Sequence, residues 1–113
     1  MNDNITVIGA GMMGSAIIKS LVKGNYKGQI TAVDIAVEKL KDLEQLGVKV
    51  SSDNRKSVDA ADIVFVIVKP GDVEKVLEDV RKEIKGKLLV SVAATVPLKF
   101  LQKNAPESRV IRI

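Results

Sequence analysis

The sequence predicts an α/β fold: a doubly wound parallel sheet of about six strands with helices on both faces. Short apolar runs alternate with segments of helical periodicity along the whole chain, which is the pattern of a parallel sheet joined by helical crossovers. The most apolar run, "IVFVIV", is only six residues long, as expected of a central strand buried on both faces. A glycine-rich turn follows the first apolar run directly. No repeat, low-complexity tract or linker is visible, so we expect one domain over residues 1–113.

The length and composition fit one globular domain. The 113 residues are 46% hydrophobic and 28% charged, which suits a soluble protein with a single core. No apolar run approaches the roughly 20 residues that cross a bilayer. The opening "MNDN" also lacks the charged and apolar regions of a signal peptide. We therefore expect a cytoplasmic protein with no membrane partner.

The residue types that are missing exclude several kinds of chemistry. The sequence has no Cys, His or Trp, so we expect no metal site and no thiol or imidazole catalysis. The net charge of +4 makes nucleic acid a candidate partner. However, the lysines are scattered and aromatic residues make up only 3%, so stacking surfaces are missing. We expect no nucleic-acid partner, and a basic surface that favours anionic ligands.

The chain opens with a strand, a helix and a second strand. Residues 5–8, "ITVI", are a short apolar run that ends at a glycine, which predicts a buried strand. Residues 12–23 repeat apolar side chains at helical spacing, and Gly24 stands at the position of a helix C-cap. Residues 29–34, "QITAVD", predict a second strand that ends in an acid.

The middle of the chain repeats this alternation. Residues 37–46 carry one apolar helical face, and Gly47 ends that helix. Residues 48–50 predict a short third strand. Residues 54–62 predict a short helical turn, and the central strand occupies residues 63–68.

The last third adds two helices and two strands. Residues 72–84 are amphipathic, with an apolar stripe that predicts a helix packed on the sheet. Residues 88–93 predict a fifth strand. Residues 97–103 predict a helix with Pro97 as its first residue, because proline is favoured there. Residues 109–113, "RVIRI", predict a sixth strand at an open sheet edge, which is prone to pair with a second chain.

The glycine-rich turn predicts a dinucleotide-binding loop of the Rossmann type. Gly9 would make the tight turn out of the strand, Gly11 would let a diphosphate approach the backbone, and Gly14 would let the helix pack closely on the strand. The amides of Met12 and Met13 would point at phosphate oxygens, with one thioether packed inward. A plain strand-to-helix turn is the alternative. The predicted diphosphate-binding residues are Gly9, Ala10, Gly11, Met12, Met13 and Gly14.

Asp34 ends the second strand about 20 residues after the glycine loop, where an acid contacts the adenosine ribose. Its carboxylate would accept hydrogen bonds from both ribose hydroxyls and would repel a 2′-phosphate. No Arg follows immediately, so we favour NAD(H) over NADP(H). Lys39 lies one helical turn later and is able to reach a phosphate, so NADP(H) stays open. A surface acid at a strand end is the alternative for Asp34.

Lys69 and Pro70 follow the expected central strand at the edge where open α/β sheets bind ligands. The segment "VIVKP" resembles the "AVKP" segment of the pyrroline-5-carboxylate reductases, and the resemblance covers essentially all 113 residues. Its most specific parts are Lys69-Pro70, Ala93-Ala94 and the terminal "VIR". The other segments that resemble this family are "IGAGMMGSAI", "GVKVSSDNRKSVDAADIVF", "SVAATV" and "RVIRI".

The resemblance implies an oxidoreductase of proline biosynthesis that uses NAD(P)H to reduce 1-pyrroline-5-carboxylate to proline. It also implies a C-terminal helical dimerisation domain, which these 113 residues would lack, and a homo-oligomeric full-length protein. We expect negligible turnover from the 113 residues alone, and we name no catalytic residue. By the resemblance, the further cofactor-binding residues are Asn54 near the adenosine, Val68, Lys69 and Pro70 on the nicotinamide side, and Ala93 and Ala94 beside the ring.

Some features leave alternatives open. Asn54 also suits a helix N-cap, and Lys69 also suits a solvated loop. Met12 and Thr95 depart from the family pattern, in which a polar residue and a glycine are usual at these positions. A coenzyme F420-dependent NADP reductase and a free-standing, non-enzymatic nucleotide-binding module remain the alternative functions.

Overall fold

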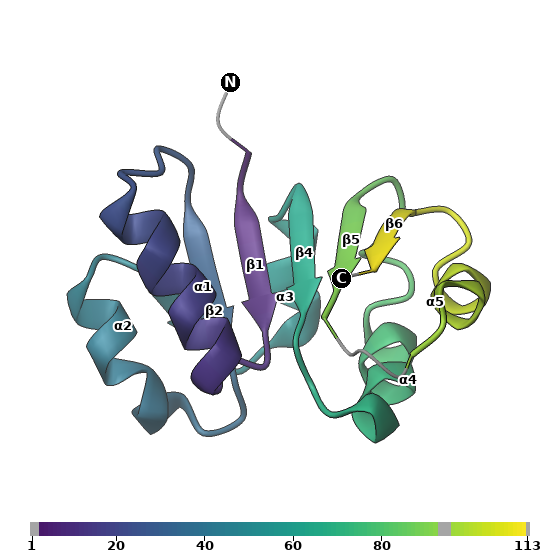
Figure 1. The fold of residues 1–113 in the computed structure, drawn as a ribbon, viewed down its shortest axis with the longest axis horizontal. Coiled ribbons are helices and arrows are strands. Elements are labelled where there is room, and N and C mark those ends of the chain that lie inside the picture. Colours follow the sequence, from purple (N-terminus) through teal and green to yellow (C-terminus); the bar gives the residue numbers. More distant parts are fainter. Residues whose placement is uncertain (1–2, 93–95, 113) are drawn as a thin grey trace.

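The computed structural model describes residues 3–92 and 96–112, which form one sheet with helices on both faces (Figure 1). The sheet has six strands in the order β3-β2-β1-β4-β5-β6, and every neighbouring pair is parallel. The predicted doubly wound α/β fold of the Rossmann type is confirmed. The strands are β1 (Ile5–Ile8), β2 (Ile30–Val33), β3 (Lys49–Ser51), β4 (Ile63–Val66), β5 (Leu88–Ser91) and β6 (Arg109–Arg112).

The helices divide between the two faces of the sheet. Helices α1, η1 and α2 pack on one face, and α3, α4 and α5 pack on the other. None of the described helices is both long and apolar enough to span a membrane, and the cytoplasmic location stays a prediction. The helices are α1 (Met12–Lys23), the 3₁₀ helix η1 (Val37–Leu40), α2 (Lys41–Gln45), α3 (Asn54–Asp59), α4 (Pro70–Asp79) and α5 (Leu98–Asn104).

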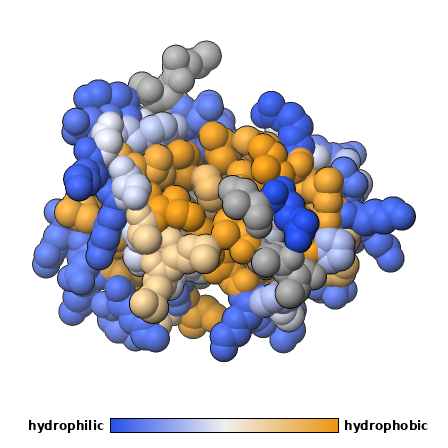
Figure 2. All heavy atoms as spheres, viewed as in Figure 1, coloured by the Kyte–Doolittle hydropathy of each residue, from blue (hydrophilic) through white to orange (hydrophobic). Residues whose placement is uncertain are grey.

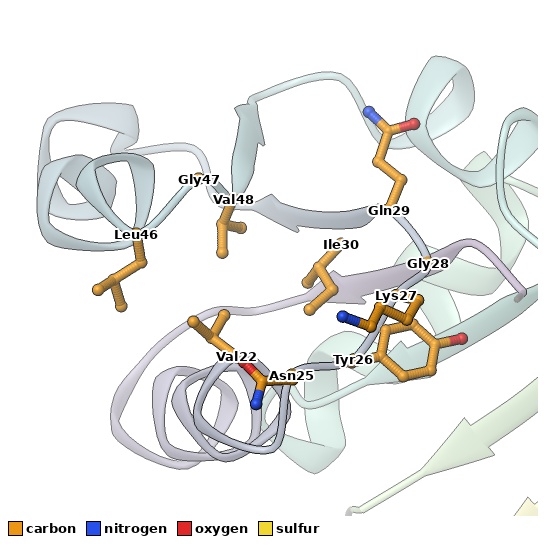
Figure 3. A pocket seen from close by; sticks show the side chains of 10 residues that line it. All are labelled: Val22, Asn25, Tyr26, Lys27, Gly28, Gln29, Ile30, Leu46, Gly47 and Val48. Carbon is orange, nitrogen blue, oxygen red and sulfur yellow. The ribbon is translucent and has the colours of Figure 1, made fainter.

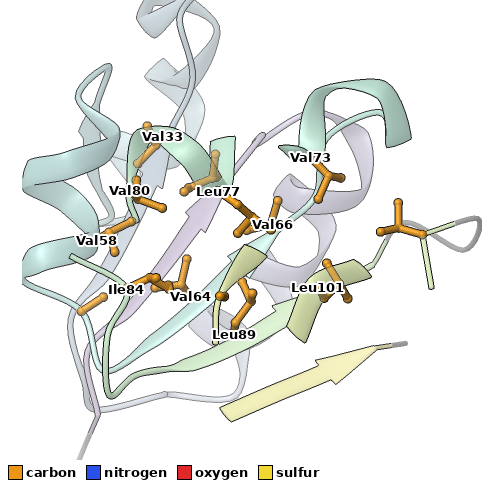
Figure 4. Packing of buried hydrophobic residues seen from close by; sticks show 14 residues of the cluster. Val33, Val58, Val64, Val66, Val73, Leu77, Val80, Ile84, Leu89 and Leu101 are labelled. Carbon is orange, nitrogen blue, oxygen red and sulfur yellow. The ribbon is translucent and has the colours of Figure 1, made fainter. Parts of the chain in front are cut away.

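The sheet separates two apolar cores. On the first face, Ile18 of α1 and Leu40 of η1 are fully buried against β1 and β2. On the second face, Leu77 of α4 and Leu101 of α5 pack with Val64 and its neighbours on the strands (Figure 4). Burial of these aliphatic side chains from both directions is what holds a parallel sheet together.

Helix α1 matches the predicted residues 12–23, but its end differs in detail. Gly24 is the C-cap with φ −81°, so it does not adopt the left-handed conformation. Asn25 adopts it instead, with φ 58°. The amide of Asn25 donates to the carbonyl of Val22 and that of Tyr26 to the carbonyl of Leu21, each at 3.0 Å. This is a Schellman motif with asparagine as the left-handed residue.

The amphipathic segment 72–84 is only partly helical. Helix α4 begins earlier, with Pro70 as its first residue, and ends at Asp79. Val80 and Ile84 of the predicted apolar stripe lie in the following turns, where both are fully buried. The stripe therefore identified the buried residues correctly, although helical geometry stops before its end.

Other predicted elements also have different boundaries. The helix expected over residues 37–46 begins as the 3₁₀ turn η1 and continues as the short α2. The strand expected over residues 63–68 ends at Val66. Pro97 is the N-cap of α5 rather than its first residue, because its ψ of 149° is extended. The prediction for Pro97 was wrong by one position.

Lys87, just before β5, ties that strand to the end of α3. Its ammonium group donates hydrogen bonds of 2.6 Å to each of the carbonyls of Val58, Asp59 and Ala61. These carbonyls belong to the last turn of α3 and the residues after it. That of Val58 also accepts the amide of Ala61 at 3.0 Å, whereas no described backbone amide donates to those of Asp59 and Ala61. One side chain thus replaces the missing donors and adds a positive charge where the helix dipole favours one.

We expect Lys87→Met to lower the free energy of unfolding by about 1–2 kcal/mol, because charged hydrogen bonds to partly buried carbonyls are lost. Urea denaturation measures the change. The matched control is Lys85→Met, which removes an ion pair with Glu107 between side chains that are 59% and 60% exposed. That variant should change the free energy by less than about 0.5 kcal/mol. Equal losses in the two variants would contradict the capping role of Lys87.

Candidate functional site

Because all six strands are parallel, the segments that follow them emerge at one edge of the sheet. Backbone hydrogen bonds hold these segments together. The amide of Gly9 donates to the carbonyl of Val33 at 3.0 Å, and that of Ile67 donates to the carbonyl of Ile8 at 2.8 Å. The amide of Asp34 donates to the carbonyl of Ser51 at 3.1 Å. The glycine loop, Asp34 and the turn after β4 are therefore neighbours.

Gly9 lies at a point of close contact between the turns after β1 and β4. Its φ is +87°, a conformation that side chains disfavour. A Cβ built here would overlap the carbonyl oxygen of Ile67 and lie 2.8 Å from Cγ1 of Val68. Only glycine fits, so the first loop lies directly against the turn after β4.

The other two glycines of the loop differ from each other. A Cβ on Gly14 would lie 2.7 Å from the carbonyl oxygen of Gly9, so glycine is required for α1 to pack against the end of β1. A Cβ on Gly11 would meet nothing within 4 Å. The protein's own packing therefore requires glycine at positions 9 and 14 but leaves the space beside Gly11 free.

The amino end of α1 has no side-chain cap. Gly11 is the N-cap, and the first helical hydrogen bond runs from the amide of Ser15 to the carbonyl of Gly11 at 2.8 Å. Among the described residues, nothing accepts a hydrogen bond from the amides of Met12 and Met13. These two donors and the helix dipole suit an anion at this position.

The methionine side chains do not lie as expected. Met12 is 95% exposed and Met13 is 54% exposed. The prediction that one thioether packs inward was wrong, because the helical period turns Gly14 and Ile18 toward the sheet. Ala10, the remaining residue of the loop, is buried.

Asp34 is half-buried and lies in a tight turn at the end of β2. One carboxylate oxygen, Oδ1, accepts a hydrogen bond of 3.0 Å from the amide of Ala36. No described donor binds the second oxygen. The next side chain, Ile35, is 95% exposed. Lys39, on η1, is exposed and forms no ion pair with Asp34 in the described part of the chain.

Asn54 is the first residue of α3, and the N-cap is Asp53, whose Oδ1 accepts a hydrogen bond of 3.1 Å from the amide of Lys56. The N-cap alternative for Asn54 was therefore wrong. Its amide Nδ2 instead donates to Oδ2 of Asp79 at 3.4 Å, beside the contact between Arg55 and Asp79. The side chain of Asn54 thus helps to join α3 to α4.

Val68, Lys69 and Pro70 follow β4 directly. Val68 is half-buried, while Lys69 and Pro70 are exposed. Lys69 is the N-cap of α4 and makes no capping hydrogen bond through its side chain. The sequence analysis placed Lys69 and Pro70 in the site but began the helix at residue 72, so it did not recognise them as the amino end of a helix. The proline at the first helical position is the signal that would have located that helix end. Ala93, Ala94 and Thr95 lie outside the described residues.

A depression of about 250 Å³ lies at the opposite edge of the sheet, between the end of α1 and the starts of β2 and β3 (Figure 3). Its ten lining residues include Val22, Tyr26, Lys27 and Leu46, and none of the predicted site residues. The candidate site is therefore the edge at which the strands end.

Comparison with known proteins supports the resemblance seen in the sequence. A family model described as "NADP oxidoreductase coenzyme F420-dependent" matches residues 4–95. The pyrroline-5-carboxylate reductase of Methanosarcina acetivorans is 39% identical over 99% of this chain and 43% of its own length. That of Escherichia coli is 34% identical over 98% of this chain and 43% of its own length.

Solved structures agree with these relatives. A pyrroline-5-carboxylate reductase from Coxiella burnetii superposes with a TM-score of 0.92 at 30% identity, over 99% of this chain and 43% of that one. An imine reductase from Myxococcus stipitatus, in complex with NADP+, gives 0.83 at 27% identity, over 96% of this chain and 39% of that one. A variant of it was solved with NAD+. The chain thus spans about two-fifths of the relatives it matches.

The edge described above, from the glycine loop through the turn after β4, lies wholly within the residues matched by the family model. This chain therefore belongs to the coenzyme F420-dependent NADP oxidoreductase family, and the relatives that it resembles along nearly its whole length are pyrroline-5-carboxylate reductases.

Proposed function

We propose that this chain forms the dinucleotide-binding part of an NAD(P)H-dependent reductase that converts 1-pyrroline-5-carboxylate to proline. The observation that carries the proposal is the free space beside Gly11, next to the uncapped amino end of α1. Glycines at positions 9 and 14 are explained by packing, but nothing in the fold requires one at 11. A ligand that approaches the backbone there explains it, and the names of the relatives supply the substrate.

In this proposal the residues of the edge hold the cofactor and orient it. The amides of Met12 and Met13 bind the diphosphate, and Asp34 binds the adenosine ribose. Val68, Lys69 and Pro70 border the nicotinamide side, with Ala93 and Ala94 assigned there by resemblance. When bound, the nicotinamide supplies the hydride, and the protein contributes position and electrostatics.

The finer part of the proposal is a preference for NADH over NADPH. The second carboxylate oxygen of Asp34 is free to accept a ribose hydroxyl, whereas a 2′-phosphate would place two negative charges side by side. Lys39, which forms no ion pair with Asp34, is the residue able to offset that repulsion. The solved neighbours include complexes with NAD+ and with NADP+, so binding measurements on this chain are needed to test the preference.

A coenzyme F420-dependent NADP reductase is the second candidate, because the matching family model carries that description. Such an enzyme must accept NADPH, which the carboxylate of Asp34 disfavours. The two candidates differ in both the preferred dinucleotide and the acceptor of the hydride. Oxidation of NADPH by F420 in place of 1-pyrroline-5-carboxylate would support the second one.

We expect Gly11→Val to abolish binding of NADH while leaving the thermal unfolding midpoint unchanged, because its side chain meets only open space in the fold. Fluorescence titration and thermal denaturation measure the two effects. Gly14→Val is the matched variant, and it should lower the midpoint because its Cβ would lie 2.7 Å from the Gly9 carbonyl oxygen. Unchanged affinity in a folded Gly11→Val protein would overturn the loop assignment.

We expect Asp34→Ser to weaken NADH by about 1.5–3 kcal/mol, or roughly 10- to 150-fold, because a charged hydrogen-bond acceptor is removed. Its affinity for NADPH should stay constant or rise. Titration of the unaltered chain and of Asp34→Ser with NADH and with NADPH, all at one ionic strength, separates these effects. If the unaltered chain binds NADPH about tenfold tighter than NADH, the proposed preference is wrong.

The substrate is tested in a chimera in which residues 1–113 replace the matched part of the Methanosarcina acetivorans relative. We expect oxidation of NADH that depends on added 1-pyrroline-5-carboxylate, and the loss of this activity in the Gly11→Val chimera. A folded chimera that binds NADH but shows no oxidation dependent on this substrate would contradict the proposed reaction. It would favour a nucleotide-binding module without reductase activity.

A further inference from the structure

Strands β1, β2 and β3 carry different side chains on the two faces of the sheet. Figure 2 views the molecule from the side of α1, where hydrophobic atoms gather over the sheet. The core that contains Ile30 of β2 lies on that side. On the opposite side the six-residue helix α3 packs on β1 and β2. The side chains beside α3 are largely polar, and they differ in this respect from those on the reverse of the same strands.

Strand register brings these polar side chains together. Successive side chains of a strand point to opposite faces, so Thr31 points away from the core that contains Ile30. Thr6 of β1 and Lys49 of β3 are the register partners of Thr31, and they share its face. Gln29 likewise points to the side of the strand opposite Ile30 (Figure 3). Three neighbouring strands thus present polar groups toward α3.

A depression of about 290 Å³ lies between this half-face and α3, and we call it the α3 depression. Helix α3 contributes Lys56 and Ser57 to its lining, and the strands contribute Thr31, Lys49 and Ser51, among others. None of the described lining residues is acidic. None of them is a predicted cofactor-binding residue, so the α3 depression is distinct from the edge that carries the glycine loop.

Two nearly buried hydroxyl groups at the α3 depression have no partner. Thr31 is 9% exposed and Ser57 is 7% exposed, and neither hydroxyl forms a hydrogen bond with another described residue. The hydroxyl of Thr6, by contrast, donates to the carbonyl of Ser57 at 2.9 Å. Buried hydroxyl groups are normally paired. The two free hydroxyls are therefore evidence that something else accepts their hydrogens.

The charge at the α3 depression is positive. Lys49 and Lys56 are exposed, and neither forms an ion pair with another described residue. Asp53, close to Lys56 in sequence, is already the N-cap of α3 and binds the backbone amide of Lys56. Two ammonium groups that line one depression repel each other, and an anion between them would remove that repulsion. Free cations beside free hydroxyl donors are the chemistry of an anion site.

The kinds of donor favour a phosphate group over a carboxylate. Lysine binds phosphate as a point charge with rotatable donors, whereas a planar carboxylate is matched by the fork of an arginine. No arginine is among the described lining residues, and no aromatic side chain is there to stack on a base. The volume also lies near the lower end for small-molecule sites. These features indicate a small phosphorylated compound or the phosphate ion itself.

We propose that the α3 depression binds the phosphate group of a small molecule. The ammonium groups of Lys49 and Lys56 offset its negative charge, and the hydroxyls of Thr31 and Ser57 donate hydrogen bonds to its oxygens. This site lies away from the glycine loop, and it stands independently of the proposed reaction and cofactor preference.

The test is a titration of the 113-residue chain, without dinucleotide, followed through its backbone amides by nuclear magnetic resonance. The two probes are inorganic phosphate and glycerol phosphate, at constant pH and with the ionic strength held constant by sodium chloride. We expect saturating shifts at Thr31, Lys49 and Ser57. Tighter binding of glycerol phosphate would identify a phosphorylated compound as the ligand, and tighter binding of inorganic phosphate would identify the ion.

Substitution of the two lysines tests the role of charge. Lys49→Gln combined with Lys56→Gln should weaken the tighter probe by about tenfold or more, because two charged donors are lost. The matched control combines Lys19→Gln with Lys103→Gln, which removes the same charge from exposed positions outside the α3 depression. That control should change the affinity by less than about twofold.

Substitution of the threonines tests the hydroxyl donors. Thr31→Val keeps the shape of the side chain and should weaken binding by about threefold or more. Thr6→Val is the matched variant, because its single hydroxyl hydrogen is already donated to the carbonyl of Ser57. It should change the affinity by less than about twofold, and circular dichroism checks that each variant is folded.

Three results would overturn the proposal. The absence of saturating shifts with either probe would mean that water alone meets the two hydroxyls. Shifts confined to the amides of Met12 and Met13 would place the anion at the amino end of α1 instead. Equal weakening in the two lysine double variants would show that net charge, and not this site, attracts the probe.

Discussion

The contact between Gly9 and the turn after β4 governs the candidate site. At this point the sheet order reverses, because β1 has β2 on one side and β4 on the other. The crossover helices that follow β1 and β4 lie on opposite faces, so the two turns diverge after they touch. A side chain at position 9 would overlap the Ile67 carbonyl and push the turns apart. The absence of one side-chain atom therefore determines how closely the amino end of α1 approaches the segment that leads into α4.

Glycine has two different roles in the loop after β1. At positions 9 and 14 glycine is required by the protein's own packing, since a Cβ would overlap neighbouring backbone. At position 11 the structure leaves room for a larger residue. The same residue type thus serves folding at two positions and, in our proposal, ligand approach at the third. The distinction depends on the space around each glycine in the fold and is not visible in the spacing of glycines along the chain.

Local sequence determined the number of strands, their succession along the chain, the limits of α1 and the position of the glycine loop. These features depend on the spacing of apolar residues and on the backbone freedom of glycine. It also identified the buried residues beyond α4 correctly.

Tertiary structure decided the rest. Asn25, not Gly24, took the left-handed conformation after α1, and Asp53 displaced Asn54 as the N-cap of α3. Asn54 turned toward Asp79, because α4 offers it a hydrogen-bond partner. The methionines of the loop faced outward, because the helical period turns Gly14 and Ile18 toward the sheet instead. Which strands each helix covers was likewise invisible in the sequence, since helical periodicity shows that a helix has an apolar side but not the strands against which that side packs. That depends on the direction of each crossover, a long-range property of the folded chain.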